Sequence, residues 1–382
     1  MFQFKILKQS KKSKARIGEI KTPHGKIITP AFIPVATLGV IKGGLDFRDL
    51  ELTKTQCQIV NTFHFLDLNR AEEVKKFGGL HKFFKFQKPI FTDSGGFQIF
   101  SLGKGAELGL GKIGSIFPEN NIQKKKEGGK LVKRITQKGI LFRSPRDGRE
   151  IYLTPELSAQ TQIKLGADFI YLLDICGSPL DDLKTAKKEM ELSHWWFERF
   201  LRIKIPPTQQ VFGIIQGGIY KELRKTSTQF VNNLPVFGIA IGGALGKSKN
   251  DMYKTISFVN RYIDWQRPHH LLGIGDLEVL EKIIKLGIDL FDCALPTRIA
   301  RHGTALTSKG YFNILKNQYK SNFEPIEKDC KCFTWQNYSI AQLNFLFKAK
   351  EQLAGRLLTI HNLYFLETQL EKIREKIEMG KL

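Results

Sequence analysis

The sequence predicts an α/β fold in which eight parallel strands form a (β/α)8 barrel of the TIM type. Short apolar runs end abruptly in polar or glycine residues at 57–65, 88–98, 168–178, 211–218, 237–243, 269–276 and 287–298. Amphipathic stretches such as "LSAQTQIKLG" and "DLEVLEKIIKLG" lie between these runs. Buried strands that alternate with helices are typical of a parallel sheet with crossover connections. With one more strand expected in the N-terminal third, the pattern favours a closed barrel over an open doubly wound sheet.

The length and composition indicate a single domain spanning residues 1–382. Of the 382 residues, 42% are hydrophobic and 25% are charged, as in folded globular proteins. No apolar run approaches the roughly 20 residues that span a bilayer, so we expect no membrane partner. Five scattered cysteines suit a reducing compartment and indicate a cytoplasmic protein. The basic start "MFQFKILKQSKKSKAR" is interpreted as a first strand, with an organelle transit peptide as the alternative.

The charge balance indicates an anionic partner. Lys and Arg total 60 against 37 Asp and Glu, a formal charge of +23. Such a field attracts polyanions, and nucleic acid is the first partner to consider. Part of the charge lies in residues 103–139, a segment rich in Gly and Lys that lacks a sustained period. We predict a surface insertion there, a long and partly disordered loop, with an RNA-touching arm as the alternative.

Polar residues and glycines follow the predicted strands at the end where an α/β barrel gathers its active site. They are Asp93, Asp174, Gln216, Gly242, Gly243, Gly273 and Asp292. Two carboxylates that converge on one pocket suit glycosyl transfer, since one attacks the anomeric carbon while the other moves protons. Asp174 and Gln216 can hydrogen-bond the amide-type edge of a purine. A helix N-cap is the simpler interpretation of each Asp alone, but their recurrence at one end of successive strands favours a site.

The ordered motifs resemble those of a known family. Five stretches are similar to the motifs of bacterial-type tRNA-guanine transglycosylases, also called queuine tRNA-ribosyltransferases: "FTDSGGFQIFSL", "FGIIQGG", "LLGIGD", "FDCALPTRIARHGTAL" and "TIHNLYFL". The resemblance covers nearly the whole chain, and "DSGGFQ" followed far downstream by "FDCALPTR" is its most specific part. It implies an eight-stranded α/β barrel with a zinc-bearing insertion, for which residues 320–365 are the counterpart here.

The resemblance also implies an activity. The enzyme would be a pentosyltransferase that replaces guanine at the anticodon wobble position of tRNA with a 7-deazaguanine, queuine or a preQ1-like base, in queuosine biosynthesis. Asp292 is implied as the nucleophile that attacks C1′ of the ribose and forms a covalent intermediate, and Asp93 as the general acid and base. No cofactor other than zinc is implied. Members of the family commonly act as homodimers.

Two sets of binding residues follow from the resemblance. The base pocket comprises Asp93, Ser94, Gly95, Gly96, Phe97, Asp174, Gln216 and Gly243, with Phe97 as the stacking ring. The RNA-contacting segments comprise Gly273, Ile274, Gly275, Asp276, Leu277, Glu278, Val279, Thr297, Arg298, Ile299, Ala300 and Arg301. The two arginines of the second set suit phosphate contacts.

The glycine loop "IGGALGKSKN" departs from the family pattern. Gly246 follows Gly243 after only two residues, and Lys247 stands where bacterial-type members carry an acid. This loop senses the substituent of the incoming base, so the choice among the deazaguanines stays open. The chain also ends without the C-terminal RNA-binding domain of archaeal relatives, which favours the wobble position over the D-arm as the target.

The predicted metal site departs from the pattern as well. The family site is Cys-x-Cys-x-x-Cys followed by a distant His, and Cys330, Cys332 and His361 fit it. The position of the third cysteine is occupied by Trp335. Indole offers no lone pair to a metal, and structural zinc prefers four ligands. The site could therefore hold zinc weakly, with Asp329 or water as a further ligand, or could have lost it.

Two other function classes stay open. A catalytically silent RNA-binding subunit of a two-subunit transglycosylase would fit the altered glycine loop and metal site, although the presence of both Asp93 and Asp292 argues against it. A retaining glycosidase on an α/β barrel would use the same two carboxylates. The formal charge of +23 argues against a carbohydrate substrate.

Overall fold

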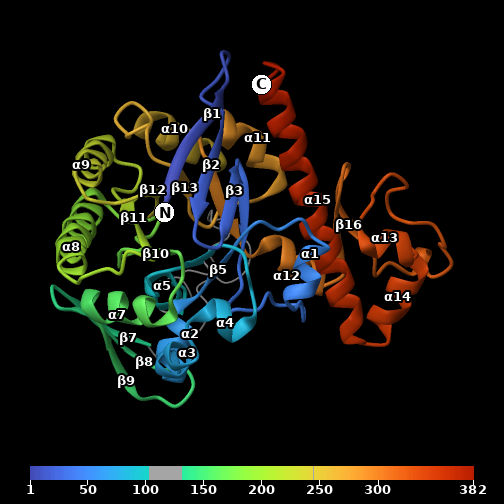
Figure 1. Ribbon diagram of the computed structural model, residues 1–382, viewed down its shortest axis with the longest axis horizontal. Coiled ribbons are helices and arrows are strands. Elements are labelled where there is room, and N and C mark those ends of the chain that lie inside the picture. Colours follow the sequence, from blue (N-terminus) through green and yellow to red (C-terminus); the bar gives the residue numbers. More distant parts are fainter. Residues whose placement is uncertain (103–130, 244) are drawn as a thin grey trace.

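Eight parallel strands form a barrel in the computed structural model, which describes residues 1–102, 131–243 and 245–382 (Figure 1). The strands are β4 (Ala31–Pro34), β5 (Gln58–Val60), β6 (Ile90–Thr92), β10 (Phe169–Tyr171), β11 (Gln210–Ile215), β12 (Gly238–Ile241), β13 (His269–Leu271) and β14 (Leu290–Cys293). They pair in the order β4-β14-β13-β12-β11-β10-β6-β5. A parallel bridge between Val35 and Ile59 joins β4 to β5 and closes the circle. The predicted barrel is confirmed, and the eighth strand is β4.

Helices lie around the outside of this barrel (Figure 1). They are α1 (Phe47–Glu51), α2 (Thr62–Leu68), α3 (Ala71–Lys76), α4 (Leu80–Phe84), α5 (Gly96–Leu102), α7 (Pro155–Leu165), α8 (Leu183–Leu201), α9 (Lys221–Asn232), α10 (Lys249–Val259), α11 (Leu277–Lys285) and α12 (Leu295–Arg301). Local signals explain where several of them begin. Thr154 accepts the Leu157 N–H and Pro155 occupies the first turn of α7, while Asp182, Ser248 and Asp276 cap α8, α10 and α11.

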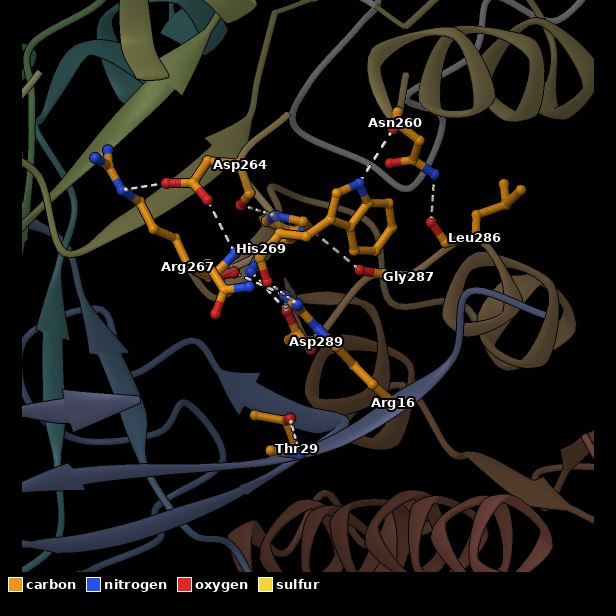
Figure 2. A network of polar contacts seen from close by, with 12 residues as sticks. Arg16, Thr29, Asn260, Asp264, Arg267, His269, Leu286, Gly287 and Asp289 are labelled. Atoms are coloured by element: carbon orange, nitrogen blue, oxygen red, sulfur yellow. Dashed lines mark hydrogen bonds and ion pairs between the residues drawn. The ribbon is translucent and has the colours of Figure 1, made fainter. Parts of the chain in front are cut away.

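A three-stranded antiparallel sheet covers the N-terminal ends of the barrel strands, a region that we call the barrel floor. Its strands are β1 (Gln3–Gln9), which confirms the predicted first strand, β2 (Arg16–Thr22) and β3 (Gly25–Thr29). Figure 2 shows how β2 is tied to the residue before β14: Arg16 Nε and Nη2 donate to the two oxygens of Asp289 at 2.9 and 2.6 Å. The His269 backbone N–H donates to the same carboxylate at 2.7 Å. Both side chains of this bidentate ion pair are buried.

Another buried carboxylate at the floor lies beside two histidines. Asp168 precedes β10, and its oxygens lie 2.8 Å from His24 Nδ1 and 3.1 Å from His81 Nε2. The two imidazole rings stack with centroids 3.4 Å apart and an interplanar angle of 12°. The nitrogen lone pairs lie in the ring planes, so those of parallel rings do not converge on one ion. We therefore interpret the three residues as a structural ion-pair cluster rather than a metal centre.

The region predicted as an insertion is partly a sheet. Residues 103–130 lie outside the described residues, but β7 (Val132–Thr136), β8 (Gly139–Arg143) and β9 (Glu150–Leu153) form an antiparallel sheet. The loop prediction is therefore wrong for the end of the 103–139 segment. Ile140 and Phe142 of β8 pack with Trp196 in a small core, whereas the middle of β7, "KRI", is exposed. The exposed charged residues of this edge strand hide the strand pattern in the sequence.

The C-terminal region forms a smaller unit on the side of the barrel (Figure 1). It comprises β15 (Thr304–Thr307), β16 (Gly310–Asn313), a 3-10 turn at Asn317–Tyr319, α13 (Phe333–Asn337) and α14 (Ile340–Lys348). Helix α15 (Gln352–Glu378) packs against both this unit and the barrel, so the predicted 320–365 subdomain ends inside a shared helix. Within the described residues, no helix is both long and apolar enough to cross a membrane.

Candidate active site

The C-terminal ends of the barrel strands, which we call the barrel mouth, carry the predicted site residues in spatial order. Around the circle come Asp292 on β14, Gly273 after β13, Gly243 after β12, Gln216 after β11, Asp174 after β10 and Asp93 after β6. The connecting helices separate these residues by up to 199 positions along the chain, between Asp93 and Asp292. The parallel sheet therefore gathers at one edge the residues that the sequence placed at separate strand ends.

Asp93 is held by neutral N–H donors. Its Oδ1 accepts the Thr62 backbone N–H at 2.9 Å and the Gly95 N–H at 3.1 Å, and its Oδ2 accepts the Asn61 amide at 2.5 Å. Burial raises the pKa of Asp93 to about 6, although these hydrogen bonds oppose the shift. A carboxyl group with this pKa can both give and take a proton near neutral pH.

Asp174 and Gln216 form a buried polar pair. Gln216 Nε2 donates to Asp174 Oδ2 at 2.6 Å, and both side chains are buried. Burial raises the pKa of Asp174 to about 7, and the nearby charge of Asp93 adds to the shift. Asp93 is therefore close enough to Asp174 for its charge to affect the pKa of Asp174. Arg224 of α9 supports this part of the mouth, since its Nη1 donates to Ile215 O and Gly242 O at 2.9 Å each.

Glycines allow the backbone to approach this pair. A Cβ at Gly96 would lie 2.7 Å from the Asp174 carbonyl oxygen. Gly243 has φ +68°, and a Cβ there would lie 2.6 Å from Gln216 Oε1. Gly95 has φ +85°, a conformation that favours glycine. The three predicted pocket glycines thus have steric or conformational reasons for their identity. Ser94, which precedes Gly95, is buried.

Phe97 lies in the first turn of α5, directly after the Gly95–Gly96 pair, and its side chain is 43% exposed. An exposed ring at the edge of a polar pocket is unusual for a large apolar side chain. It provides a surface on which a flat ligand can stack.

Asp292 has one oxygen held and the other open. Oδ1 accepts the Gly273 backbone N–H at 3.0 Å and lies 3.0 Å from His270 Nε2. Among the described residues, no hydrogen bond reaches Oδ2. The side chain is 15% exposed, so solvent or a ligand can reach it.

The sequence missed His270 and Tyr171, which lie behind Asp292. His270 Nδ1 lies 2.5 Å from the Tyr171 hydroxyl, and both residues are buried. The pair "HH" at 269–270 begins one of the apolar runs that predict the strands. The alternation of side chains along a strand could have shown that one of the two faces the barrel interior.

The predicted RNA segments place few side chains at the surface. Ile274, Val279, Thr297 and Ala300 have buried side chains, and Asp276 caps α11 while accepting the Tyr311 hydroxyl at 2.5 Å. Arg301 donates to Lys42 O at 3.2 Å and is partly buried, which lowers its pKa. Of the segment 273–279, Glu278 is the exposed residue.

Cys330, Cys332 and His361 come together as predicted. His361 Nδ1 lies 3.8 Å from Cys330 Sγ and 3.4 Å from Cys332 Sγ, while its Nε2 lies 2.8 Å from Leu306 O. That carbonyl orients the ring so that Nδ1 points at the thiols, as in many metal sites. A hydrogen bond with Cys332 lowers the pKa of the Cys330 thiol. These three donors could hold a metal ion, while Trp335 packs edge-on against His361 with centroids 5.3 Å apart and supplies no fourth ligand.

Asp93 and Asp292 at the barrel mouth each accept backbone N–H groups. Two carboxylates held in this way define an α/β-barrel enzyme equipped for nucleophilic and acid–base chemistry. The family model for queuine tRNA-ribosyltransferase matches residues 10–382. The queuine tRNA-ribosyltransferase of Protochlamydia amoebophila is 41% identical over 99% of this chain and 95% of its own. That of Chlamydia muridarum is 42% identical over 98% of both chains, and a putative one from Archaeoglobus fulgidus is 41% identical over 96% and 94%.

The chain belongs to the queuine tRNA-ribosyltransferase family. It is therefore a pentosyltransferase of the tRNA-guanine transglycosylase type, and the predicted family is confirmed.

Proposed function

We propose that this enzyme exchanges guanine at the anticodon wobble position of tRNA for a 7-deazaguanine through a covalent bond between Asp292 and the ribose. The observation that carries the proposal is the state of the Asp292 carboxylate. Its Oδ1 is held by the Gly273 N–H at 3.0 Å, and Oδ2 has no hydrogen-bond partner among the described residues. A carboxylate fixed through one oxygen presents the other to an electrophile.

In the first displacement, Oδ2 of Asp292 attacks C1′ of the target ribose. The C1′–N9 bond breaks, its electron pair leaves with guanine, and Asp93 gives guanine a proton. In the second displacement, Asp93 takes a proton from N9 of the incoming base, N9 attacks C1′, and the C1′–Oδ2 electron pair returns to Asp292. Two inversions preserve the configuration of the sugar.

The pKa of Asp93, raised by burial to about 6, suits both half-reactions. Protonation of guanine needs the acid form, so formation of the covalent intermediate should slow as the pH rises above about 6. Deprotonation of the incoming base needs the carboxylate, so breakdown of the intermediate should slow as the pH falls below about 6.

Base recognition is proposed for the pair of Asp174 and Gln216. In the free protein Gln216 donates to Asp174 at 2.6 Å. A bound purine edge, with its own donors and acceptor, would replace this hydrogen bond by hydrogen bonds to both side chains. The exposed ring of Phe97 would stack on the base. The glycine loop after Gly243 carries exposed Lys247, whose backbone N–H donates to Asp251 at 3.1 Å. We propose that the incoming base is queuine or a preQ1-like base.

tRNA binding is proposed to rest on the positive charge of the chain, +23, and on Arg298 and Arg301 near the mouth. Guanidinium groups at this place suit the phosphates that flank the target nucleotide. The base must leave its stack to reach the carboxylates, at a cost of a few kcal/mol that is smaller in a loop. We place the enzyme in the cytoplasm with its substrate.

The test is exchange of labelled guanine into unmodified tRNA, followed by incubation with queuine and with the preQ1 base. Wild-type protein should form a denaturation-resistant adduct with tRNA, and Asp292→Ala should not. An adduct formed by Asp292→Ala would overturn the nucleophile assignment. A protein that binds tRNA without exchange would instead be a silent subunit, and hydrolysis of added aryl glycosides would indicate a glycosidase.

We propose that Cys330, Cys332 and His361 hold a structural zinc ion. Water would be the fourth ligand, because Trp335 occupies the sequence position of the family's third cysteine. Two thiolates and an imidazole are the ligands that zinc prefers, and zinc would link the start of α13 to α15. Metal analysis of the purified protein should find close to one zinc per chain. A content below a tenth of an equivalent would contradict this proposal.

We further propose a homodimer. Support comes from an apolar groove of about 400 Å³ on the C-terminal unit, lined by Phe323, Tyr338, Phe345 and Leu353 among others. Phe323 and Phe345 are 78% and 70% exposed, which suits a surface covered by a second copy. The molar mass in solution should be twice that of the chain for wild type, and Phe345→Ser should lower it. A monomeric wild-type protein would contradict the proposal.

A further inference from the structure

We propose that His270, oriented by Tyr171, is a positioning residue for Asp292: it holds Oδ1 and thereby leaves Oδ2 as the attacking oxygen. The inference rests on the proposed role of Asp292 as the nucleophile. It concerns a buried chain of three side chains from three strands, in which His270 Nδ1 lies 2.5 Å from the Tyr171 hydroxyl and His270 Nε2 lies 3.0 Å from Asp292 Oδ1.

The surroundings of His270 are apolar apart from these two partners. Its side chain is fully buried in the barrel interior, where the rings of Phe91, Phe212 and Tyr171 surround it at centroid distances of 6.4, 6.5 and 5.7 Å. Within the described part of the chain, Asp292 is the only carboxylate within ion-pair distance of the His270 ring. The imidazole therefore has one charged neighbour, the nucleophile.

Tyr171 determines which nitrogen of His270 carries the proton. Among the described residues, His270 Nδ1 is the one hydrogen-bond partner of the buried Tyr171 hydroxyl, at 2.5 Å. We infer that the hydroxyl donates to Nδ1, because its O–H would otherwise be buried without an acceptor. A neutral imidazole that accepts at Nδ1 carries its own proton on Nε2. That N–H is on the side of Asp292, where it can donate to Oδ1.

Two N–H groups thus converge on one oxygen of the nucleophile, one from Gly273 and one from His270, each at 3.0 Å. In the free protein the Nε2 contact has the distance but not the alignment of a hydrogen bond. Catalytic hydrogen bonds of free enzymes commonly tighten when substrate binds. The pair limits rotation of the carboxylate and makes its two oxygens different.

The effect on the reaction is asymmetric. An N–H donor stabilises a carboxylate anion more than the ester that replaces it in the covalent intermediate. When the intermediate breaks down, the C1′–Oδ2 electron pair returns to the carboxylate, and the His270 N–H stabilises the returning charge. Loss of this donor should therefore slow breakdown of the intermediate more than its formation.

The experiment compares wild type with His270→Phe, His270→Gln and Tyr171→Phe in single-turnover reactions with unmodified tRNA. Formation of the adduct and its breakdown by added guanine are measured separately. His270→Phe keeps an aromatic ring but no donor, whereas the Gln side chain can place an amide N–H near the position of Nε2. Selective ¹⁵N labelling of histidine reports the tautomer of His270 in wild type and in Tyr171→Phe.

We expect His270→Phe to lower kcat by about 10²-fold, as for a misplaced reacting group, with accumulation of the adduct and an apparent KM for tRNA that falls together with kcat. His270→Gln should recover part of the loss, and Tyr171→Phe should weaken the Nε2–H signature. Equal slowing of both half-reactions, or no advantage of Gln over Phe, would overturn the inference. Wild-type protein without any adduct would instead contradict the proposed function.

Discussion

Asp168 and Asp289 precede β10 and β14 at the floor, whereas Asp93 and Asp174 follow β6 and β10 at the mouth, and the two pairs of carboxylates have different partners. Asp292, the third aspartate of the mouth, lies 3.0 Å from His270. Asp289 and Asp168 at the floor face Arg16 and a pair of histidines. At the mouth, Asp93 and Asp174 take part in none of the ion pairs of the described residues, and their hydrogen-bond donors are amides and backbone N–H groups.

This difference distinguishes the carboxylates that pair with Arg16 or the histidines from those to which we assign acid–base chemistry and base recognition. A bidentate guanidinium satisfies a buried carboxylate and keeps it ionised and unreactive. Neutral donors orient a carboxylate without neutralising its charge, so burial raises the pKa of Asp93 to about 6 and that of Asp174 to about 7. Burial in the barrel is thus used for stability at one end and for acid–base chemistry at the other.

The largest expected effect is on activity at the mouth. Asp93→Asn should lower the rate of base exchange by about 10²–10⁴-fold, because the amide cannot transfer the proton. The matched floor variant, Asp289→Asn, should exchange bases at a near-normal rate per folded molecule. Rates are measured by incorporation of labelled guanine at a pH where both proteins are folded. A similar loss of activity in both variants would remove the distinction between the two ends.

The next effect is on stability at the floor. Arg16→Met leaves the buried carboxylate of Asp289 without its cation, and we expect the free energy of unfolding to fall by about 3–5 kcal/mol. Urea unfolding followed by circular dichroism measures the change. The folded fraction should retain the KM of wild type for tRNA. A loss below about 1 kcal/mol would show that the floor pair does not stabilise the fold.

A matched pair of glycines gives a smaller contrast. Gly243 at the mouth and Gly287 at the floor have φ values of +68° and +86°, and a Cβ would lie 2.6 Å from Gln216 Oε1 or 2.5 Å from the Trp265 ring, respectively. Each substitution by Ala should cost about 1–3 kcal/mol of strain. Gly243→Ala should also raise the KM for the base, whereas Gly287→Ala should lower only the melting temperature. Equal KM values would contradict the placement of Gly243 in the pocket.

The smallest effect is the pH dependence of stability, which should have opposite signs for Asp174 at the mouth and Asp168 at the floor. The raised pKa of Asp174, about 7, means that the folded protein binds a proton that the unfolded chain releases, so stability falls as the pH rises from about 4 to 7. Asp174→Asn should therefore stabilise the protein at pH 8, and the gain should shrink toward pH 4.

Asp168 provides the control for this measurement. Burial alone would raise the pKa of Asp168, but hydrogen bonds with His24 and His81 lower it below the usual value. Its stabilisation is present above the unfolded pKa and is lost as the pH falls. Asp168→Asn should thus destabilise the protein at pH 8, by an amount that shrinks in acid. The same sign for both variants would contradict the contrast.

The sequence predicted the mouth better than the floor for a physical reason. Buried parallel strands form continuous apolar runs, so the residue at which each run ends is visible, as with Asp93 after "KPIFT". The partners of a floor carboxylate lie far away in sequence: Arg16 and Asp289 are separated by 273 positions. No local pattern predicts such a pair. Strand β7 was missed because its exposed residues are charged.

Within the mouth, the prediction named the residues to which we assign chemistry but not those behind them. Asp292 follows an apolar run, whereas Tyr171 and His270 lie inside such runs and look like packing residues. The metal cluster was predicted through the resemblance to the family pattern, and Trp335 lies beside His361 with ring centroids 5.3 Å apart.

The adjacent histidines of β13 have a consequence for how this protein tolerates insertions and deletions. The ring nitrogens of His269 lie 3.2 and 2.9 Å from the carbonyl oxygens of Gly287 and Asp264, whereas His270 Nε2 lies 3.0 Å from Asp292 Oδ1 inside the barrel. Because strand side chains alternate, inserting or deleting one residue here would turn each imidazole to the wrong side of the sheet. Such a change would remove a stabilising contact and a catalytic contact together. We therefore expect lineages of this enzyme to vary in loop length around β13 but not within it.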